Sequence, residues 1–170
     1  MKKRVVYVNG NFVDEDKAKV SVFDRGFLFA DAVYEVTAVI DGKILEWDGH
    51  VKRLERSLKE LDMQFPISET ELLDIHFDLI KKNTLKEGLI YLQVSRGEDD
   101  RSFDYPDESV KPTLVLFTQV KSLAESNIAK TGLKVISVPD MRWGRRDIKT
   151  VQLLAPSMCK MMAKKKNKDD

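Results

Sequence analysis

Cysteine is almost absent from this sequence, because Cys159 is the only one among 170 residues. One thiol cannot form an internal disulfide, and such sparse use is typical of proteins in a reducing compartment. Long hydrophobic runs are absent too, and Asn9, Gly10 and Asn11 interrupt the amino-terminal apolar run well before it could serve as a signal peptide. We therefore expect a cytoplasmic protein with no membrane partner.

Neither sign of charge is in excess, since 29 Lys and Arg stand against 28 Asp and Glu for a formal net charge of +1. This balance removes the electrostatic argument for a nucleic-acid partner and favours small molecules or protein surfaces. Hydrophobic residues make up 42% and charged residues 34% of the chain. That composition is ordinary for a globular protein, and the chain is long enough to bury a core without disulfides.

Histidine is scarce, and His50 and His76 lie far apart in helical patterns. Metal centres need clustered ligands, so we expect no metal site. Glycine-rich phosphate loops and nucleophile elbows are absent as well. Three arginines within residues 142–146, next to a tryptophan, predict either a solvated edge or an anion site.

Two short turn signals stand between β-rich runs. Asn9-Gly10 separates residues 5–8 from 11–13, and Asp41-Gly42 separates 36–40 from 43–47. Both positions of a two-residue hairpin turn need positive φ, which Asn, Asp and Gly adopt readily, so two antiparallel hairpins are predicted. Further strands are predicted at 89–96, 113–120 and 133–138.

Three segments have helical patterns. Residues 49–63 repeat apolar side chains at steps of three and four, which predicts one amphipathic helix. Ser68–Glu71 has the pattern of a capping box and predicts a second helix over 69–82. A third helix is predicted over 148–165, where Pro156 would kink it or split it.

These elements define an α+β class and a division of the chain. Residues 1–120 are expected to form an amino-terminal α+β domain, and the polar, aperiodic residues 121–132 an interdomain linker. Residues 133–170 would begin a second domain. One strand and one helix cannot bury both of their apolar faces, so we expect that second domain to be incomplete.

Lys149 stands among apolar residues at the entry to the last predicted helix. A helical lysine is ordinarily a solvated surface residue. A lysine held between apolar neighbours and close to cations is instead a good nucleophile toward carbonyl groups. Spacing alone leaves both interpretations open.

Four motifs follow one another along the chain: Asp24-Arg25-Gly26-Phe27-x-Phe29-Ala30-Asp31-Ala32-Val33-Tyr34-Glu35-Val36, His50-x-x-Arg53-Leu54, Ile90-Tyr91-x-Gln93-Val94-x-Arg96-Gly97, and Arg142-Trp143 with Asp147-Ile148-Lys149-x-x-x-Leu153-Leu154. In this order and spacing they resemble the class IV pyridoxal-phosphate aminotransferases, most of all the D-amino-acid aminotransferases. The resemblance implies the amino-terminal domain of a fold-type IV aminotransferase, an antiparallel sheet with two helices, followed by the start of the cofactor-binding domain.

The resemblance also implies a cofactor, pyridoxal 5'-phosphate, and a set of roles. Lys149 matches the catalytic lysine that binds the cofactor covalently, Arg53 the arginine on its phosphate, and Glu35 an acidic residue near it. Tyr34 matches the tyrosine on the substrate side. Arg101 matches an arginine that binds the substrate carboxylate from the partner subunit of a homodimer.

The implied reaction is transamination of D-amino acids, in which D-alanine and 2-oxoglutarate give pyruvate and D-glutamate. Two features depart from the family pattern. Arg101-Ser102-Phe103 stands where the D-specific pattern has Arg-x-His, and family members extend well beyond residue 170. We therefore expect the 170 residues alone to be weakly active or inactive. A branched-chain L-amino-acid aminotransferase, a 4-amino-4-deoxychorismate lyase and a non-catalytic remnant remain open.

Overall fold

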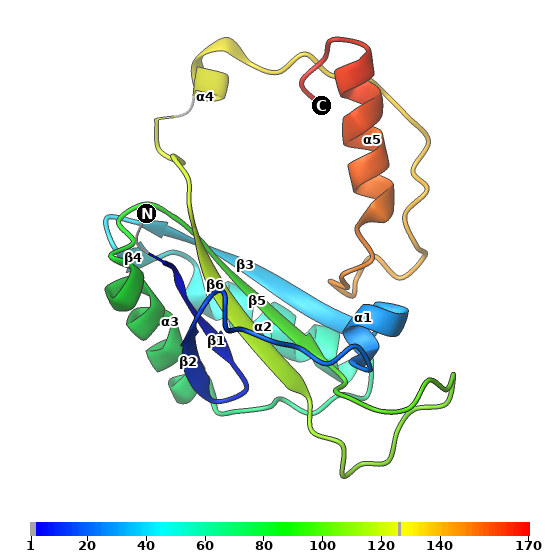
Figure 1. Ribbon diagram of the computed structural model, residues 1–170. Coiled ribbons are helices and arrows are strands. Elements are labelled where there is room, and N and C mark those ends of the chain that lie inside the picture. Colours follow the sequence, from blue (N-terminus) through cyan, green and yellow to red (C-terminus); the bar gives the residue numbers. More distant parts are fainter. Residues whose placement is uncertain (1–2, 126) are drawn as a thin grey trace.

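A six-stranded antiparallel sheet in the order β2-β1-β6-β5-β3-β4 forms the centre of the computed structural model, which describes residues 3–125 and 127–170 (Figure 1). The elements are β1 (Val5–Val8), β2 (Asn11–Asp14), α1 (Arg25–Phe29), β3 (Ala32–Ile40), β4 (Lys43–Ile44), α2 (Trp47–Lys59), α3 (Glu69–Asn83), β5 (Gly88–Ser95), β6 (Thr113–Val120), α4 (Asn127–Thr131) and α5 (Leu154–Lys165). The predicted α+β class, with an antiparallel sheet and two helices packed on it, is confirmed.

Both predicted hairpins are present. Asn9 and Gly10 have φ of 45° and 91°, and Asp41 and Gly42 have φ of 50° and 72°, as two-residue turns with positive φ require. The return strand of the second hairpin is shorter than predicted. β4 pairs only with the end of β3, because α2 already begins at Trp47.

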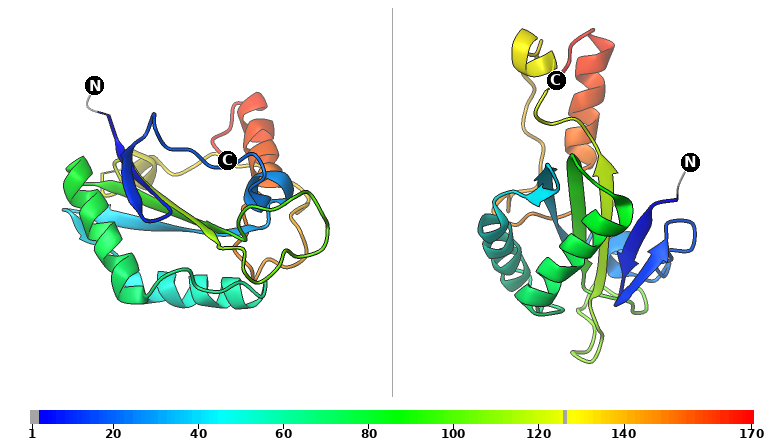
Figure 2. Two further views of the ribbon diagram at one scale, coloured as in Figure 1. Left: turned by 60° about the horizontal axis from the view of Figure 1, so that its bottom comes forward. Right: turned by 90° about the vertical axis from the view of Figure 1, so that its left-hand side faces the viewer.

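Helices α2 and α3 lie on one face of the sheet and enclose the core (Figure 2). The predicted cap of α3 is confirmed, since the Ser68 hydroxyl accepts a hydrogen bond from the Glu71 backbone N–H at 3.2 Å. The buried leucines of the two helices include Leu54, Leu58 and Leu79. Each contributes roughly 2 kcal/mol by removing its apolar surface from water.

Side chains of β3 alternate between the two faces of the sheet. Val33, Glu35 and the other odd-numbered residues of the strand are buried, whereas Tyr34 and the other even-numbered residues after Ala32 are half-buried on the opposite face. Residues 20–27 cross that opposite face above β5 and β6 (Figure 1). Neighbouring residues of β3 thus serve two different environments.

The strand predicted at 133–138 is wrong. The segment is extended, but no strand of the described residues pairs with it, and Val135 is exposed. Its hydrogen bonds go instead to the end of the chain, from the Lys134 N–H to the Asp169 carboxylate and from the Ile136 N–H to the Asp170 carbonyl, both at 2.8 Å. A β-rich pattern makes a strand only where a second strand offers hydrogen-bond partners.

The helix predicted over 148–165 begins later, at Leu154. Residues 148–153 are not helical because they pair with the start of β3, where Thr150 forms a bridge with Val33. Pro156 falls within the first turn of α5, where a missing N–H costs nothing, so the proline neither kinks nor splits the helix. The predicted linker, of which residue 126 lies outside the described residues, contains the short helix α4. No helix in the described ranges has the length and apolarity to cross a membrane.

Candidate functional site

Lys149 is fixed by its backbone between β3 and α2. Its carbonyl oxygen accepts a hydrogen bond from the Tyr34 N–H at 3.0 Å, and its own N–H donates to the Ser57 hydroxyl at 3.2 Å. The side chain is half-buried, and its Nζ lies 4.1 Å from the centre of the Tyr34 ring, a cation–π contact. The structure therefore brings together two of the predicted site residues.

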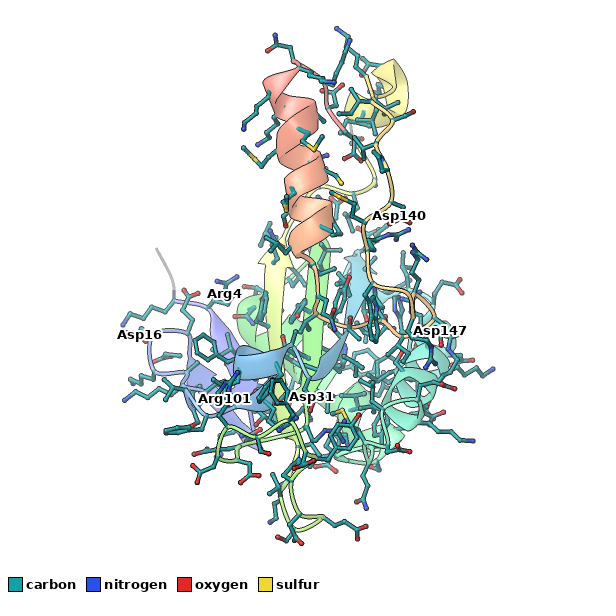
Figure 3. The ribbon with its side chains drawn as sticks, turned by 90° about the vertical axis from the view of Figure 1, so that its right-hand side faces the viewer. Arg4, Asp16, Asp31, Arg101, Asp140 and Asp147 are labelled. Carbon is teal, nitrogen blue, oxygen red and sulfur yellow. The ribbon has the colours of Figure 1, made fainter. Side chains whose placement is uncertain are left out.

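A pocket of about 300 Å³ opens around the Lys149 amine. Tyr34, Trp143, Arg142 and Arg146 line it with Lys149, and none of its lining residues is acidic. One carboxylate stands beside it: Asp140, on the extended segment that runs next to α5 (Figure 3), pairs with Arg142 at 2.8 Å and Arg146 at 3.2 Å. The hydrogen bonds from Arg142 hold the pKa of Asp140 well below its usual value. Three cations and one carboxylate leave a surplus of positive charge, which suits an anionic ligand.

The three arginines within residues 142–146 are predicted to form either a solvated edge or an anion site, and the structure shows features of both. Arg142 and Arg146 line the pocket, in agreement with an anion site. Arg145 is exposed and pairs with Glu60 at 2.6 Å and Asp147 at 2.8 Å, so it belongs to a solvated edge. Residues only a few positions apart serve different purposes because the chain turns there.

Aromatic rings form a column across the sheet behind Tyr34. Tyr34 stacks on Tyr91 with ring centres 5.7 Å apart, and Tyr91 stacks on Phe117 at 4.9 Å. The Tyr91 hydroxyl donates to the Gln93 side-chain oxygen at 2.9 Å. Burial, with a smaller contribution from Tyr34, raises the pKa of Tyr91 to about 12, so its phenol stays neutral. The column spans three strands, and of its rings Tyr34 lines the Lys149 pocket.

Glu35 lies next to Tyr34 in β3 but faces α2. Arg53 donates to its two carboxylate oxygens at 2.6 Å each, and His50 Nδ1 lies 2.8 Å from one of them. Burial alone would raise the pKa of Glu35, but the hydrogen bonds from Arg53 and His50 outweigh it and keep the pKa below its usual value. The three side chains form an ionised cluster on the helical side of β3.

The predicted cofactor-binding pair Arg53 and Glu35 is therefore together, but neither residue lines the Lys149 pocket. The hydrogen bonds to Glu35 raise the pKa of Arg53. β4 pairs only with the end of β3, so among the described residues the first half of the β3 edge has no strand beside it. The segment that contains Lys149 lies along this part of the edge, next to Tyr34. The cluster thus stands behind the strand edge at which Lys149 is held.

Arg101 lies in the connection from β5 to β6, where its guanidinium carbon is 5.3 Å from the Phe29 ring and 5.5 Å from the Phe103 ring. The pocket around Lys149 does not include it. Of the five predicted site residues, Tyr34 and Lys149 line the pocket, Glu35 and Arg53 pair on the helical side of β3, and Arg101 contacts Phe29 of α1.

Sequence reasoning missed His50, Trp143 and Gln152 as members of the site. A signal existed for His50, because residues three apart on a helix share a face and Arg53 is its neighbour on α2. Gln152 lines the pocket only because residues 148–153 are extended, which the helical prediction could not reveal. In the described part of the chain, no group of three or more His, Cys, Asp or Glu is arranged to hold a metal ion.

The family is shown by a direct match, in which residues 32–170 fit the family described as amino-transferase class IV. The chain belongs to this family. It is 35% identical over 162 residues to the D-alanine aminotransferase of Staphylococcus haemolyticus, and 36% identical over 162 residues to that of Staphylococcus epidermidis. Each match covers 95% of this chain and 57% of the relative, so the chain spans little more than half the length of these relatives.

Solved structures confirm the fold at lower identity. The branched-chain amino acid aminotransferase of T.th., complexed with N-(5'-phosphopyridoxyl)-L-glutamate, matches with a TM-score of 0.81 at 20% identity, over 99% of this chain and 57% of that one. A putative 4-amino-4-deoxychorismate lyase of Legionella pneumophila matches with a TM-score of 0.78 at 22% identity, over 92% and 56%. These likenesses show the shared fold of fold-type IV aminotransferases.

Proposed function

We propose that the protein is a pyridoxal-phosphate-dependent aminotransferase for D-amino acids, which converts D-alanine and 2-oxoglutarate to pyruvate and D-glutamate. The observation that carries the proposal is the Lys149 amine, held over the Tyr34 ring in a cationic pocket of a class IV aminotransferase chain. The D-alanine aminotransferases among its relatives, at 35% and 36% identity, support the choice of substrate.

The residues around Lys149 fit pyridoxal phosphate, which is an aromatic aldehyde with a phosphate group. A primary amine suits the aldehyde, Trp143 and Tyr34 suit the ring, and the surplus cationic charge suits the phosphate. When bound, the cofactor stabilises the negative charge that develops at the substrate Cα. We assign Arg53 to the phosphate, with Glu35 holding its guanidinium in a two-point hydrogen bond.

The protein's own groups then have simple tasks. With the cofactor bound, the Lys149 Nζ would take the proton from the substrate Cα and later give it up, acting first as base and then as acid. Its backbone hydrogen bonds to Tyr34 and Ser57 hold the amine at a fixed position. Tyr34 lies between this amine and Tyr91, on the side where we place the substrate.

Arg101 does not line the Lys149 pocket of its own chain, so we propose a homodimer in which a second copy supplies Arg101 to bind the substrate carboxylate. Phe27 and Phe103, near the Arg101 end of the molecule, are 74% and 83% exposed, which fits a surface that a second copy covers. Sedimentation velocity should detect a dimer that Phe103→Asp weakens. A strictly monomeric protein at high concentration contradicts this assignment. The cytoplasmic location predicted from cysteine use remains a prediction.

Cofactor attachment is tested by adding pyridoxal phosphate to the chain and reducing with borohydride. Mass spectrometry should find the reduced cofactor on the peptide that contains Lys149. Lys149→Ala should abolish the modification, whereas Lys160→Ala, at an exposed lysine paired with Asp170, should leave it unchanged. Equal labelling of both variants contradicts the proposed role of Lys149 and favours the alternative that the chain is a non-catalytic remnant.

A branched-chain L-amino-acid aminotransferase or a 4-amino-4-deoxychorismate lyase is the second candidate, and Phe103 favours it. An exposed phenyl ring that packs on Phe29 at 5.7 Å stands where the D-specific pattern has a histidine. Parallel assays with D-alanine, L-leucine and aminodeoxychorismate separate these functions. Turnover of L-leucine or aminodeoxychorismate without turnover of D-alanine would overturn the first assignment within the same family.

A further inference from the structure

The connection from β5 to β6, residues 96–112, carries Arg101 at its exposed tip. The base of this loop is closed tightly, because Gly97 has φ of +108° and a Cβ there would lie only 2.2 Å from the Lys111 carbonyl oxygen. The tip is held differently. Arg25 Nη1 donates to the Ser102 and Asp104 carbonyl oxygens, at 2.8 and 3.2 Å.

A second arginine supports the same tip. The Arg96 guanidinium carbon lies 3.6 Å from the centre of the Tyr105 ring, a close cation–π contact. Arg96 also donates to the Leu61 carbonyl oxygen at 2.8 Å, which ties it to the connection between α2 and α3. The loop tip therefore rests on two arginine side chains from outside residues 101–105.

Both arginines meet at one carboxylate, that of Asp31. The Nε atoms of Arg25 and Arg96 lie 2.8 and 2.7 Å from the same Asp31 oxygen, and Arg96 Nη2 lies 3.1 Å from the other. The arginine side chains are only 3% and 9% exposed, so water cannot replace this partner. Removing one member of such a buried group leaves uncompensated charge, which is strongly destabilising.

Asp31 also connects this loop to the candidate site. It directly precedes β3, and its carbonyl oxygen accepts from the Arg96 N–H at 3.2 Å. Two residues further on, Val33 pairs with Thr150, beside Lys149. Figure 3 shows Asp31 and Arg101 at the same end of the molecule, beside α1. One residue thus contacts both arginines that hold the loop and stands at the start of the strand that holds Lys149.

We propose that Asp31 is a positioning residue for Arg101. Through Arg25 and Arg96 it holds residues 101–105 in the shape that presents the Arg101 guanidinium to a carboxylate ligand. The identity of that ligand, the substrate of an aminotransferase, rests on the proposed function. The restraint on the loop does not, so the two can be tested separately.

The restraint is tested on the 170-residue chain by limited trypsin digestion, with cleavage after Arg101 followed by mass spectrometry. Asp31→Asn keeps the side-chain shape but removes the charge, and should accelerate this cleavage about tenfold by freeing the loop tip. Cleavage after Lys166, in the exposed tail, should keep its rate. This site is the internal control, since general unfolding would accelerate cleavage after both Arg101 and Lys166. Asp62→Asn is the matched control, since Asp62 touches Arg96 only through its backbone carbonyl.

Tyr105→Leu keeps the test valid if Asp31→Asn fails to fold. Tyr105 is exposed, so its loss spares the core but removes the ring on which Arg96 packs. We expect a smaller acceleration, confined to the loop. Unchanged cleavage after Arg101 in a folded variant, or equal acceleration of both sites, overturns the proposal.

Kinetics of the cofactor-loaded protein test the link to Arg101. Asp31→Asn should raise the KM for the amino acid about tenfold with little change in kcat, as for a lost binding interaction. The same substitution should raise KM no further when Arg101 is already Ala, because Asp31 then has nothing to position. Additive effects would show that Asp31 acts independently of Arg101. If the 170 residues have no turnover, as we expect of this chain alone, borohydride labelling of Lys149 tests the proposed function and the trypsin result decides the role of Asp31.

Discussion

Apolar side chains in the sheet region and in the arm beyond it have opposite environments. In residues 3–120, Leu79, Ile90 and Leu116 are fully buried between the sheet and its two helices. In residues 133–170, α5 projects away from the sheet, and Leu154 and Met158 on it are 74% and 49% exposed (Figures 1 and 2). Only Ile148, Thr150 and Ala163 of the arm are buried.

The difference shows that a helix can form its backbone hydrogen bonds without packing on a core, whereas a strand needs a second strand to form them. α5 forms its hydrogen bonds internally although it buries little more than Ala163. Residues 133–138 have the composition of a strand but no partner strand, and they remain irregular. The arm contributes to the candidate site where it pairs with β3, at residues 148–151.

Replacing a leucine by alanine in each region should give the largest difference in the free energy of unfolding between them. Leu79→Ala should lower the free energy of unfolding by about 3 kcal/mol, because it leaves a cavity in a packed core. Leu154→Ala, at an exposed position, should change it by less than about 0.5 kcal/mol. Urea unfolding monitored by circular dichroism measures both. Equal losses would show that the arm is packed as tightly as the sheet region.

The sheet region should also respond to acid through His76. Burial, reinforced by His50 and partly offset by the hydrogen bond to Leu72, lowers the pKa of His76 to about 4 from its usual 6.5. Between these two pH values the unfolded state binds a proton that the folded state does not. Stability should therefore fall by on the order of 3 kcal/mol as pH drops from 6.5 to 4, and be independent of this group above 6.5.

His76→Leu should flatten that dependence. Urea unfolding at several pH values compares the two proteins. If the leucine variant loses as much stability as the wild type between pH 6.5 and 4, His76 is not the responsible group.

The buried ion pair of the site should matter more than an exposed pair of the same geometry. Glu35→Gln should cost about 2 kcal/mol at pH 7, reduced because water still reaches Arg53. Glu15→Gln, which breaks the exposed two-point pair with Arg4, should cause no measurable change.

The pKa of Glu35 is lowered, so its contribution is present above about pH 4.5 and disappears as pH falls through the lower native value. The glutamine variant and the wild type should therefore converge as pH falls below 4.5, which unfolding at a series of acidic pH values measures. A difference that stays constant over the whole acidic series would contradict the ionised pair.

Ile148→Val should give a smaller effect than Leu79→Ala or Glu35→Gln, and it tests a buried contact between the two regions. A lost methylene at this buried position should cost about 1 kcal/mol, as should Ile90→Val in the sheet. Only Ile148→Val should raise hydrogen exchange at the amides of residues 149–151. If both variants leave that exchange unchanged, the arm is held by its backbone pairing alone.

Much of the sheet region could be predicted because its signals are local. Asn9-Gly10 and Asp41-Gly42 specify their turns by backbone conformation, and Ser68 caps α3 within three residues. The predicted strand at 113–120 coincides with β6. Apart from the short return strand β4, the errors fall in the arm, at 133–138 and 148–153, where conformation depends on whether a distant partner is present.

The sequence alone determined the local conformations and, through motif resemblance, the family, because turns, caps and periodic stripes depend only on neighbouring residues. Tertiary structure decided that Lys149 lies over Tyr34 while Arg101 does not, and that Arg53 and His50 share the carboxylate of Glu35. These side chains are far apart along the chain, and no local periodicity fixes a contact between them. Strand pairing of residues 148–151 with β3, and the packing of α2 beneath it, bring them to one place.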